Sequence, residues 1–174
     1  MPPRMERLAV VRGSARFDPE QVAAIEQAVE RRRGEPWFEA AAAAFELESS
    51  GVASEEELRQ AMADMLPLYF HRWDDRAQRY GAAVQGDVPN ADALALWERE
   101  IFGTFDPRPQ LASMTCPTLV ITGVDDFITG PTAAKEVAAR VADAQLVILP
   151  ECGHMLWVEQ PEGFWTAVSS FFRG

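Results

Sequence analysis

Two short loops carry the residue types that could perform acid–base chemistry. Asp125 and Asp126 come directly after an apolar run at residues 118–122, and His154 follows another apolar run at residues 146–149. Because ligands gather at the carboxyl ends of strands in a parallel sheet, we expect both loops to open on the same edge. A carboxylate there can fix the tautomer of an imidazole, which then accepts a proton from a nucleophile. The spacing therefore predicts an orienting acid and a general base.

Each of these side chains also has an ordinary structural interpretation. An aspartate after a strand is commonly a turn former or a helix cap, and we interpret Asp125 in that way. Cys152 lies on the same loop as His154, but catalytic Cys–His pairs normally come from separate parts of a fold, and a free cysteine usually packs as a small hydrophobe. His71 stands beside Arg72 in a polar stretch. We interpret it as a surface or cap residue.

Three short apolar runs predict the strands that position these loops, at residues 8–11, 118–122 and 146–149. None alternates apolar with polar side chains, so each is expected to be buried on both faces, as parallel strands covered by helices are. Pro131 and Pro161 begin two helical patterns that follow the second and third runs. The order strand, helix, strand, helix is typical of a parallel sheet, so the predicted fold class is α/β.

A long helical insertion separates the first two predicted strands. Its helices are expected at residues 19–33, 36–48, 54–66, 70–80 and 90–102. Ser54 and Glu57 have the spacing of a capping box at the start of the third helix. The prediction is a core formed by residues 1–18 and 107–174, with an all-helical cap formed by residues 19–106.

The stretch from residue 117 to residue 172 resembles the C-terminal end of an α/β-hydrolase. That family follows its seventh strand with Gly-x-x-Asp and its eighth with Gly-His, and it often has Glu-x-Pro at the start of the final helix. The matching positions here are Gly123 and Asp126, Gly153 and His154, and Glu159 and Pro161. The resemblance implies a partial α/β-hydrolase fold, a three-stranded parallel sheet flanked by helices with the helical insertion as its cap. It also implies that Asp126 orients His154 and that His154 is the general base.

The nucleophile of such a fold is missing from the sequence. The family carries it on a Gly-x-Ser-x-Gly elbow, and the oxyanion hole is built partly by the residue that follows it. No such elbow, with Ser, Cys or Asp, occurs in the 174 residues, and Ser14 beside Gly13 does not form one. We therefore expect the C-terminal half of a serine hydrolase, inactive until an N-terminal half supplies the nucleophile. A non-catalytic binding or interaction module is the alternative.

A short motif in the predicted cap bears on the substrate. The segment from Leu94 to Glu98 is similar to the cap helix of proline iminopeptidases, where Trp-x-x-Trp-Glu presents a carboxylate to a free amine. Trp97 and Glu98 match the second half of that motif, and Leu94 replaces its first tryptophan. The resemblance implies that Trp97 and Glu98 bind substrate and favours an aminopeptidase. A small-molecule esterase is the alternative, and a solvated helix face is the structural interpretation of Glu98.

Composition limits the partners. The net charge of −11 disfavours nucleic acid, and the run from Arg31 to Arg33 is interpreted as the basic end of a helix. No apolar run is long enough for a membrane span and the N-terminus lacks the pattern of a signal peptide, so we expect a cytoplasmic protein without membrane contact. No metal and no organic cofactor is implied. The expected partners are a small-molecule or peptide substrate and either an N-terminal half or a second copy, paired at the exposed edge of residues 8–11.

Overall fold

The computed structural model describes residues 5–50, 54–84 and 90–174. The remaining positions, which belong to the predicted core and insertion, lie outside the described residues. The strands are β1 (Leu8–Val11), β2 (Thr118–Gly123) and β3 (Ala144–Leu149). The helices are α1 (Pro19–Glu30), α2 (Phe38–Ser49), α3 (Glu55–Met65), the 3-10 turn η1 (Leu66–Tyr69), α4 (Asp75–Val84), α5 (Ala91–Leu96), the π-helical turn η2 (Trp97–Ile101), α6 (Arg108–Leu111), α7 (Pro131–Arg140), α8 (Leu156–Glu159) and α9 (Pro161–Arg173).

The three strands form one parallel sheet in the order β1-β2-β3. Leu8 pairs with Thr118, which pairs in turn with Ala144. Every residue of β2 is buried, as expected for the middle strand of a parallel sheet that has helices on both faces. The predicted α/β class and the three-stranded parallel sheet are confirmed.

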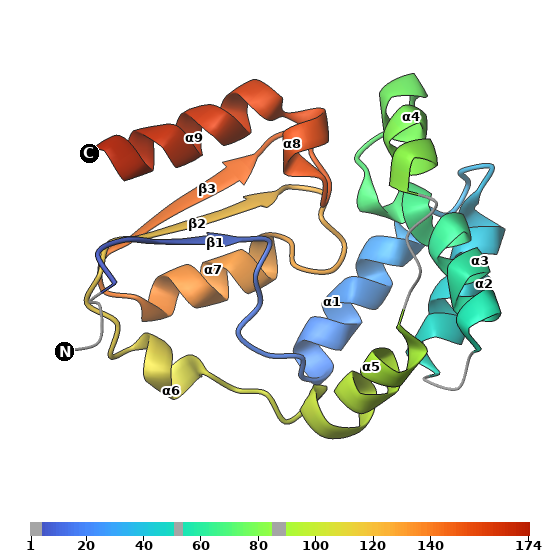
Figure 1. Cartoon of the computed structure of the whole chain (residues 1–174), viewed down its shortest axis with the longest axis horizontal. Helices are drawn as coiled ribbons and strands as arrows, with labels where there is room; N and C mark the ends of the chain where they lie inside the picture. The colour runs from blue at the N-terminus through green and yellow to red at the C-terminus, as the bar shows by residue number, and fades with distance from the viewer. Residues whose placement is uncertain (1–4, 51–53, 85–89) are drawn as a thin grey trace.

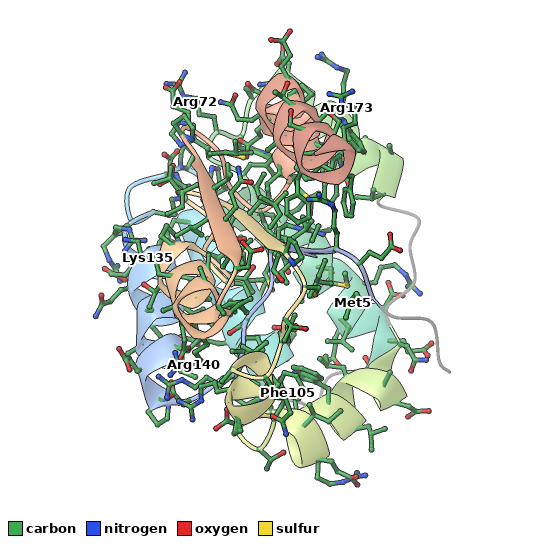
Figure 2. The ribbon with its side chains drawn as sticks, turned by 90° about the vertical axis from the view of Figure 1, so that its left-hand side faces the viewer. Met5, Arg72, Phe105, Lys135, Arg140 and Arg173 are labelled. Carbon is green, nitrogen blue, oxygen red and sulfur yellow. The ribbon has the colours of Figure 1, made fainter. Side chains whose placement is uncertain are left out.

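Helices cover both faces of the sheet (Figure 1). Leu119 and Ile121 pack in one apolar cluster with Phe164 of α9, whereas Val120 packs on the other side with Val137 of α7. This division follows from the alternation of side chains along a strand. On the outer side of α7, Lys135 projects away from the sheet (Figure 2).

The elements from α1 to η2 all lie between β1 and β2 in the chain and gather at one end of the sheet (Figure 1). They have an apolar core of their own, which Phe127 from the loop after β2 joins. The capping box at the start of α3 is confirmed, since Ser54 accepts from the Glu57 N–H and the Glu57 side chain accepts from Ser54. Among the described helices, none is both long and apolar enough to cross a membrane.

Two helix boundaries in the insertion differ from the prediction. The helix expected from residue 70 begins only at Asp75, because the Asp74 carboxylate accepts from the N–H groups of Arg76 and Ala77 and thereby starts the helix there. The helix expected to run from residue 90 to residue 102 divides into α5 and the π-helical turn η2.

The interpretation of the arginine run as a helix end is also incomplete. The helix α1 ends at Glu30, and the guanidinium of Arg32 extends across to the carbonyl oxygens of Phe70 and His71, at 3.0 and 3.1 Å. We call residues 69–72 the strap, because this irregular segment of the insertion lies against the loop after β3. Arg32 thus fixes the strap from the side of α1.

Both outer strands of the sheet, β1 and β3, have an edge without a neighbouring strand among the described residues, and the β1 edge is the one that the sequence predicts for pairing. The N–H groups of Leu8 and Arg12 donate to β2-side carbonyls, those of Pro117 and Ile121, each at 3.0 Å. Because N–H directions alternate along a strand, the N–H groups of Ala9 and Val11 face the open side. These are the groups that another strand would use.

Candidate active site

The structure brings the predicted acid and base into direct contact. The Nδ1 atom of His154 lies 2.9 Å from Oδ2 of Asp126, across the loops that follow β3 and β2. A carboxylate accepts only, so the proton of this hydrogen bond sits on Nδ1 of the imidazole. Nε2 makes no hydrogen bond with the described part of the chain, which leaves it free to accept a proton. This is the geometry of an imidazole oriented as a general base.

Asp126 is held rigidly before it contacts the histidine. Its side chain is fully buried, and Oδ1 accepts from the N–H groups of Ile128 and Thr129 at 3.0 and 2.9 Å. The hydroxyl of Thr129 donates to Oδ2 at 2.9 Å. Burial on its own would raise the pKa of Asp126, but the hydrogen bonds from His154 and Thr129 outweigh it and hold the pKa below its ordinary value. Asp126 is therefore a carboxylate over the whole neutral range.

The strap and the end of β1 surround His154. Its N–H donates to the carbonyl of Tyr69 at 2.7 Å, and the two rings meet edge to face with centroids 5.4 Å apart. The guanidinium of Arg12 donates to the His154 carbonyl at 3.1 Å and lies over the Trp157 ring at 4.4 Å from its centroid. Arg12 has a φ of 54°, a backbone conformation that costs energy for a non-glycine residue and is often found at functional sites.

A second histidine–aspartate pair lies beside the first, and it corrects two interpretations. Nδ1 of His71, in the strap, is 2.6 Å from Oδ2 of Asp125. Asp125 is thus not simply a turn former, and His71 is not a free surface residue, because its side chain is only 24% exposed. The pair joins the helical insertion to the loop that carries Asp126.

Two glycines allow these loops to approach one another. A Cβ atom on Gly123 would lie 2.2 Å from the carbonyl oxygens of Cys152 and Gly153, and one on Gly153 would lie 2.6 Å from the Tyr69 carbonyl. Neither distance is compatible with a side chain. The glycines of the Gly-x-x-Asp and Gly-His motifs are therefore required by the close packing of backbone against backbone.

The substrate-binding residues expected in the cap line a cavity of about 490 Å³. Trp97 and Glu98 form one wall, and Tyr69 and Phe127 place the cavity next to His154 and Asp126. Glu48 of α2, which the sequence did not indicate, shares the cavity with Glu98. Burial raises the pKa of both glutamates, and the charge of Glu98 raises that of Glu48 further.

Tyr69 also lines a smaller cavity of about 240 Å³ on its other side, together with Leu66, Tyr80 and Met155. This second cavity is mainly apolar. Tyr69, which lines both cavities, contacts His154, and Met155 of the smaller cavity follows His154 directly in the chain.

The thiol and hydroxyl considered as replacement nucleophiles are both unsuitable. Cys152 is completely buried, and its environment, first by desolvation and then by the charges of Glu159 and Asp126, raises the pKa of its thiol to about 12. The hydroxyl of Ser14 donates to the carbonyl of Arg16 at 2.7 Å. No residue among those described occupies the position of an activated nucleophile next to His154.

Sequence patterns did not identify several residues that complete the site. Tyr69, Glu48 and Arg12 come from three separate elements and carry no local motif. Glu159 belongs to the quoted Glu-x-Pro pattern, but the pattern does not reveal what its carboxylate binds.

Comparison with known proteins identifies relatives of the chain. The family described as "Alpha/beta hydrolase family" matches residues 4–167. A 2-hydroxy-6-oxo-6-(2'-aminophenyl)hexa-2,4-dienoic acid hydrolase from Metapseudomonas resinovorans is 35% identical over 79 residues, which are 45% of this chain and 27% of that protein. A proline iminopeptidase from Pestalotiopsis fici is 30% identical over 107 residues, or 62% of this chain and 37% of that protein.

Solved structures give the same fold. An alpha/beta fold family hydrolase from Bacillus anthracis superimposes with a TM-score of 0.69 at 15% identity and covers 95% of this chain. The match extends over 58% of that hydrolase, so the chain spans little more than half of its length. At this identity the likeness shows the fold alone.

Proposed function

The chain belongs to the α/β-hydrolase family, and we propose that it supplies the acid, the base and the cap of a serine hydrolase that cleaves amide or ester bonds. The hydrogen bond of 2.9 Å between His154 and Asp126 is the observation that carries the proposal. Asp126 holds the proton on Nδ1, so that Nε2 takes the proton of a serine hydroxyl and later returns it to the leaving group. Asp126 remains ionised throughout and stabilises the imidazolium.

The serine and the oxyanion hole come from an N-terminal half in this proposal. The open edge of β1 supports it, because the N–H groups of Ala9 and Val11 face the side where a further parallel strand would add. Self-association of the chain through the same edge is the competing arrangement. The proposal retains the cytoplasmic location that the sequence predicts.

The larger cavity supports a substrate that carries an amine. Four glutamates, Glu48 and Glu98 among them, share its wall with apolar and aromatic side chains, and no Lys, Arg or His is among the described residues that line it. Such a cavity favours a cation attached to an apolar body, because a charged hydrogen bond is strongest where water is excluded. An aminopeptidase that removes an N-terminal residue is accordingly the first choice. The proline iminopeptidase among the relatives supports it, whereas the dienoic acid hydrolase keeps a small-molecule hydrolase as the second choice.

The proposed chemistry is tested by completing the enzyme. The chain is co-expressed with an N-terminal half that carries a Gly-x-Ser-x-Gly elbow, and the purified complex is assayed on proline arylamides and on aryl esters. We expect His154→Gln to lower kcat by at least about 10³-fold. The matched control is Glu162→Gln, an exposed position in the first turn of α9, which should leave activity unchanged. A completed enzyme whose activity is the same with and without His154 contradicts the proposal.

The amine preference has a separate test in the same complex. Glu98→Gln and Glu48→Gln should each raise KM for a substrate with a free N-terminal amine by about 10- to 100-fold, the cost of losing one charged hydrogen bond. KM for the N-acetylated substrate should not change. Glu100→Gln, on the same π-helical turn but exposed, is the control. If cleavage of the free amine survives both substitutions, the enzyme is an esterase or small-molecule hydrolase instead.

A non-catalytic binding module is the second candidate, and one observation favours it: the described lining of the larger cavity is mainly apolar and aromatic, as small-molecule binding sites commonly are. Trp97 in its wall makes the test direct. If the chain is a binding module, addition of an aromatic amine should quench the fluorescence of Trp97. No N-terminal half should then give the chain any activity.

A further inference from the structure

The carboxylate of Glu159 is buried in an unusual way. The residue is only 8% exposed, yet its two oxygens accept from three backbone N–H groups: Gly153 at 2.6 Å, His71 at 2.8 Å and Arg72 at 3.3 Å. Within the described residues it forms no ion pair with Arg, Lys or His. A buried charge is costly unless its hydrogen bonds are satisfied, so this arrangement is a specific feature of the fold.

These N–H groups belong to two segments that are far apart in the sequence. Gly153 directly precedes His154, whereas His71 and Arg72 are part of the strap. The Arg72 side chain is 70% exposed and points to the outside of the molecule (Figure 2), so Glu159 uses only the backbone of this residue. One carboxylate therefore joins the histidine loop to the helical insertion.

Two further contacts make the same connection. The N–H of His154 donates to the Tyr69 carbonyl at 2.7 Å, and His71 pairs with Asp125 at 2.6 Å. Because Gly153 has no side chain, its backbone packs directly against the backbone of Tyr69, Phe70 and His71. The strap and the histidine loop thus form a single packed unit, and Glu159 lies at its centre.

We propose that Glu159 is a positioning residue, which keeps the His154 imidazole at hydrogen-bond distance from Asp126 by fastening the histidine loop to the strap. The physical reason is that without the carboxylate the N–H groups of Gly153 and His71 would be buried without acceptors, and the loop would move to reach water. A displacement of about 1 Å at a catalytic group can reduce the rate about 10²-fold. The inference rests on the proposed role of His154 as the base.

The chain is well suited to a direct test, since His71 and His154 are its only histidines. Each imidazole donates its Nδ1 proton to an aspartate carboxylate, so the isolated chain should show two low-field imidazole proton signals by NMR. His71→Gln identifies the signal of His154 by removing the other, and Asp126→Asn shows the spectrum in which the His154 bond is lost.

In Glu159→Gln we expect loss of the His154 signal, with the methyl signals of the folded core retained. The control Glu162→Gln removes the same charge from an exposed site and should keep the signal. A residue that merely stabilised α8 would lower stability in Glu159→Gln but leave the His154 signal in place. That result would overturn the proposal.

If Glu159→Gln does not fold, amide hydrogen exchange of the unaltered chain tests whether the strap and the loop that carries His154 are fastened together. The amide protons of Gly153, His71 and His154 should have matched protection, because all three are freed when the strap separates from the loop that carries His154. Protection factors that differ by more than about tenfold would contradict the connection.

Activity of the completed enzyme is a separate readout. Glu159→Gln should lower kcat by about 10- to 100-fold and change KM much less, because Glu159 itself does not line the larger cavity. An equal change in kcat and KM would contradict a positioning role. If the completed enzyme has no activity at all, the proposed function fails, while the NMR and exchange results still decide the role of Glu159.

Discussion

The two carboxylate oxygens of Asp126 have different partners. Oδ1 accepts two backbone N–H groups and shapes the turn that leads to α7, while Oδ2 holds His154 and accepts the Thr129 hydroxyl. A turn former and an orienting acid are competing interpretations of an aspartate after a strand, yet one side chain has the contacts of both. The turn is what prevents Asp126 from adopting another rotamer, so the structural role serves the chemical one.

The lowered pKa of Asp126 predicts how stability depends on pH. Its folded pKa lies below the ordinary value of 3.8, so the stabilisation is fully present above 3.8 and is lost as the pH falls through the folded pKa. Urea unfolding at several pH values should show that Asp126→Asn is less stable by about 1–3 kcal/mol at pH 6. The difference should shrink steadily below pH 3.8. A difference that stays constant down to pH 2 would show that the charge is irrelevant.

Burial of Cys152 predicts that the two thiols react at very different rates. Only the thiolate reacts, and Cys152 is inaccessible with a pKa of about 12, whereas Cys116 is half-buried. A disulfide reagent at pH 8 should modify Cys116 first and Cys152 more than about 100-fold more slowly. Mass spectrometry of peptides identifies the site, and urea should remove the difference. Rapid modification of Cys152 in the native chain would place it in an open site after all.

At the scale of elements, the sequence predicts the features whose determinants lie within a few residues of one another in the chain. The strand β2 ends at Gly123, Pro150 follows β3 directly, and the capping box of α3 is complete within four residues. The strap is different, because Glu159 accepts from two of its N–H groups and Arg32 donates to two of its carbonyls, and both residues lie far away in the chain. Residues 70–74 look like a helix because nothing within that window shows these partners.

The same distinction applies to the candidate site. Asp126 and His154 are predictable because each follows a strand in a short motif. Glu48 and Tyr69 are not, because they enter the site through the packing of α2 and η1 against the loop after β2. The side-chain pattern of a helix shows which face is apolar but not which loop that face will meet.

The close approach of the loops after β2 and β3 predicts the effect of a single methyl group. Gly123→Ala places a Cβ against two backbone carbonyls, and backbone cannot rotate away as a side chain can. The free energy of unfolding should fall by about 1–3 kcal/mol in urea titrations. Gly163→Ala is the control. Gly163 lies in α9, where alanine is favoured over glycine, and its Cβ would meet only the flexible tip of the Leu149 side chain. Equal stability of both variants would mean that the loops separate easily.

In the part of the molecule that the structure describes, three apolar clusters hold the fold together and both outer strands of the sheet have an open edge. Two clusters hold the sheet between its covering helices, and the third holds the insertion together. On its outer side β1 has no neighbouring strand among the described residues, and its end leads into Arg12, which contacts His154. A net charge of −11 opposes close contact between copies. The outward-facing N–H groups of Ala9 and Val11 make the β1 edge the surface at which we expect two copies to pair.

This edge gives a prediction for the chain in solution. At about 100 μM the chain should elute as a dimer or larger species, well above the 19.3 kDa of one copy, because an unpaired strand recruits another. Ala9→Pro should shift it towards the monomer, since Ala9 directs its N–H outward and proline is tolerated at that position of an edge strand. Val10→Pro removes a donor that faces β2, as alternation from Leu8 and Arg12 requires, so it should destabilise the fold instead. Light scattering coupled to size exclusion separates these outcomes. A chain that is monomeric at every concentration, or an Ala9→Pro variant that associates as strongly as the original, would show that the β1 edge is not the pairing surface.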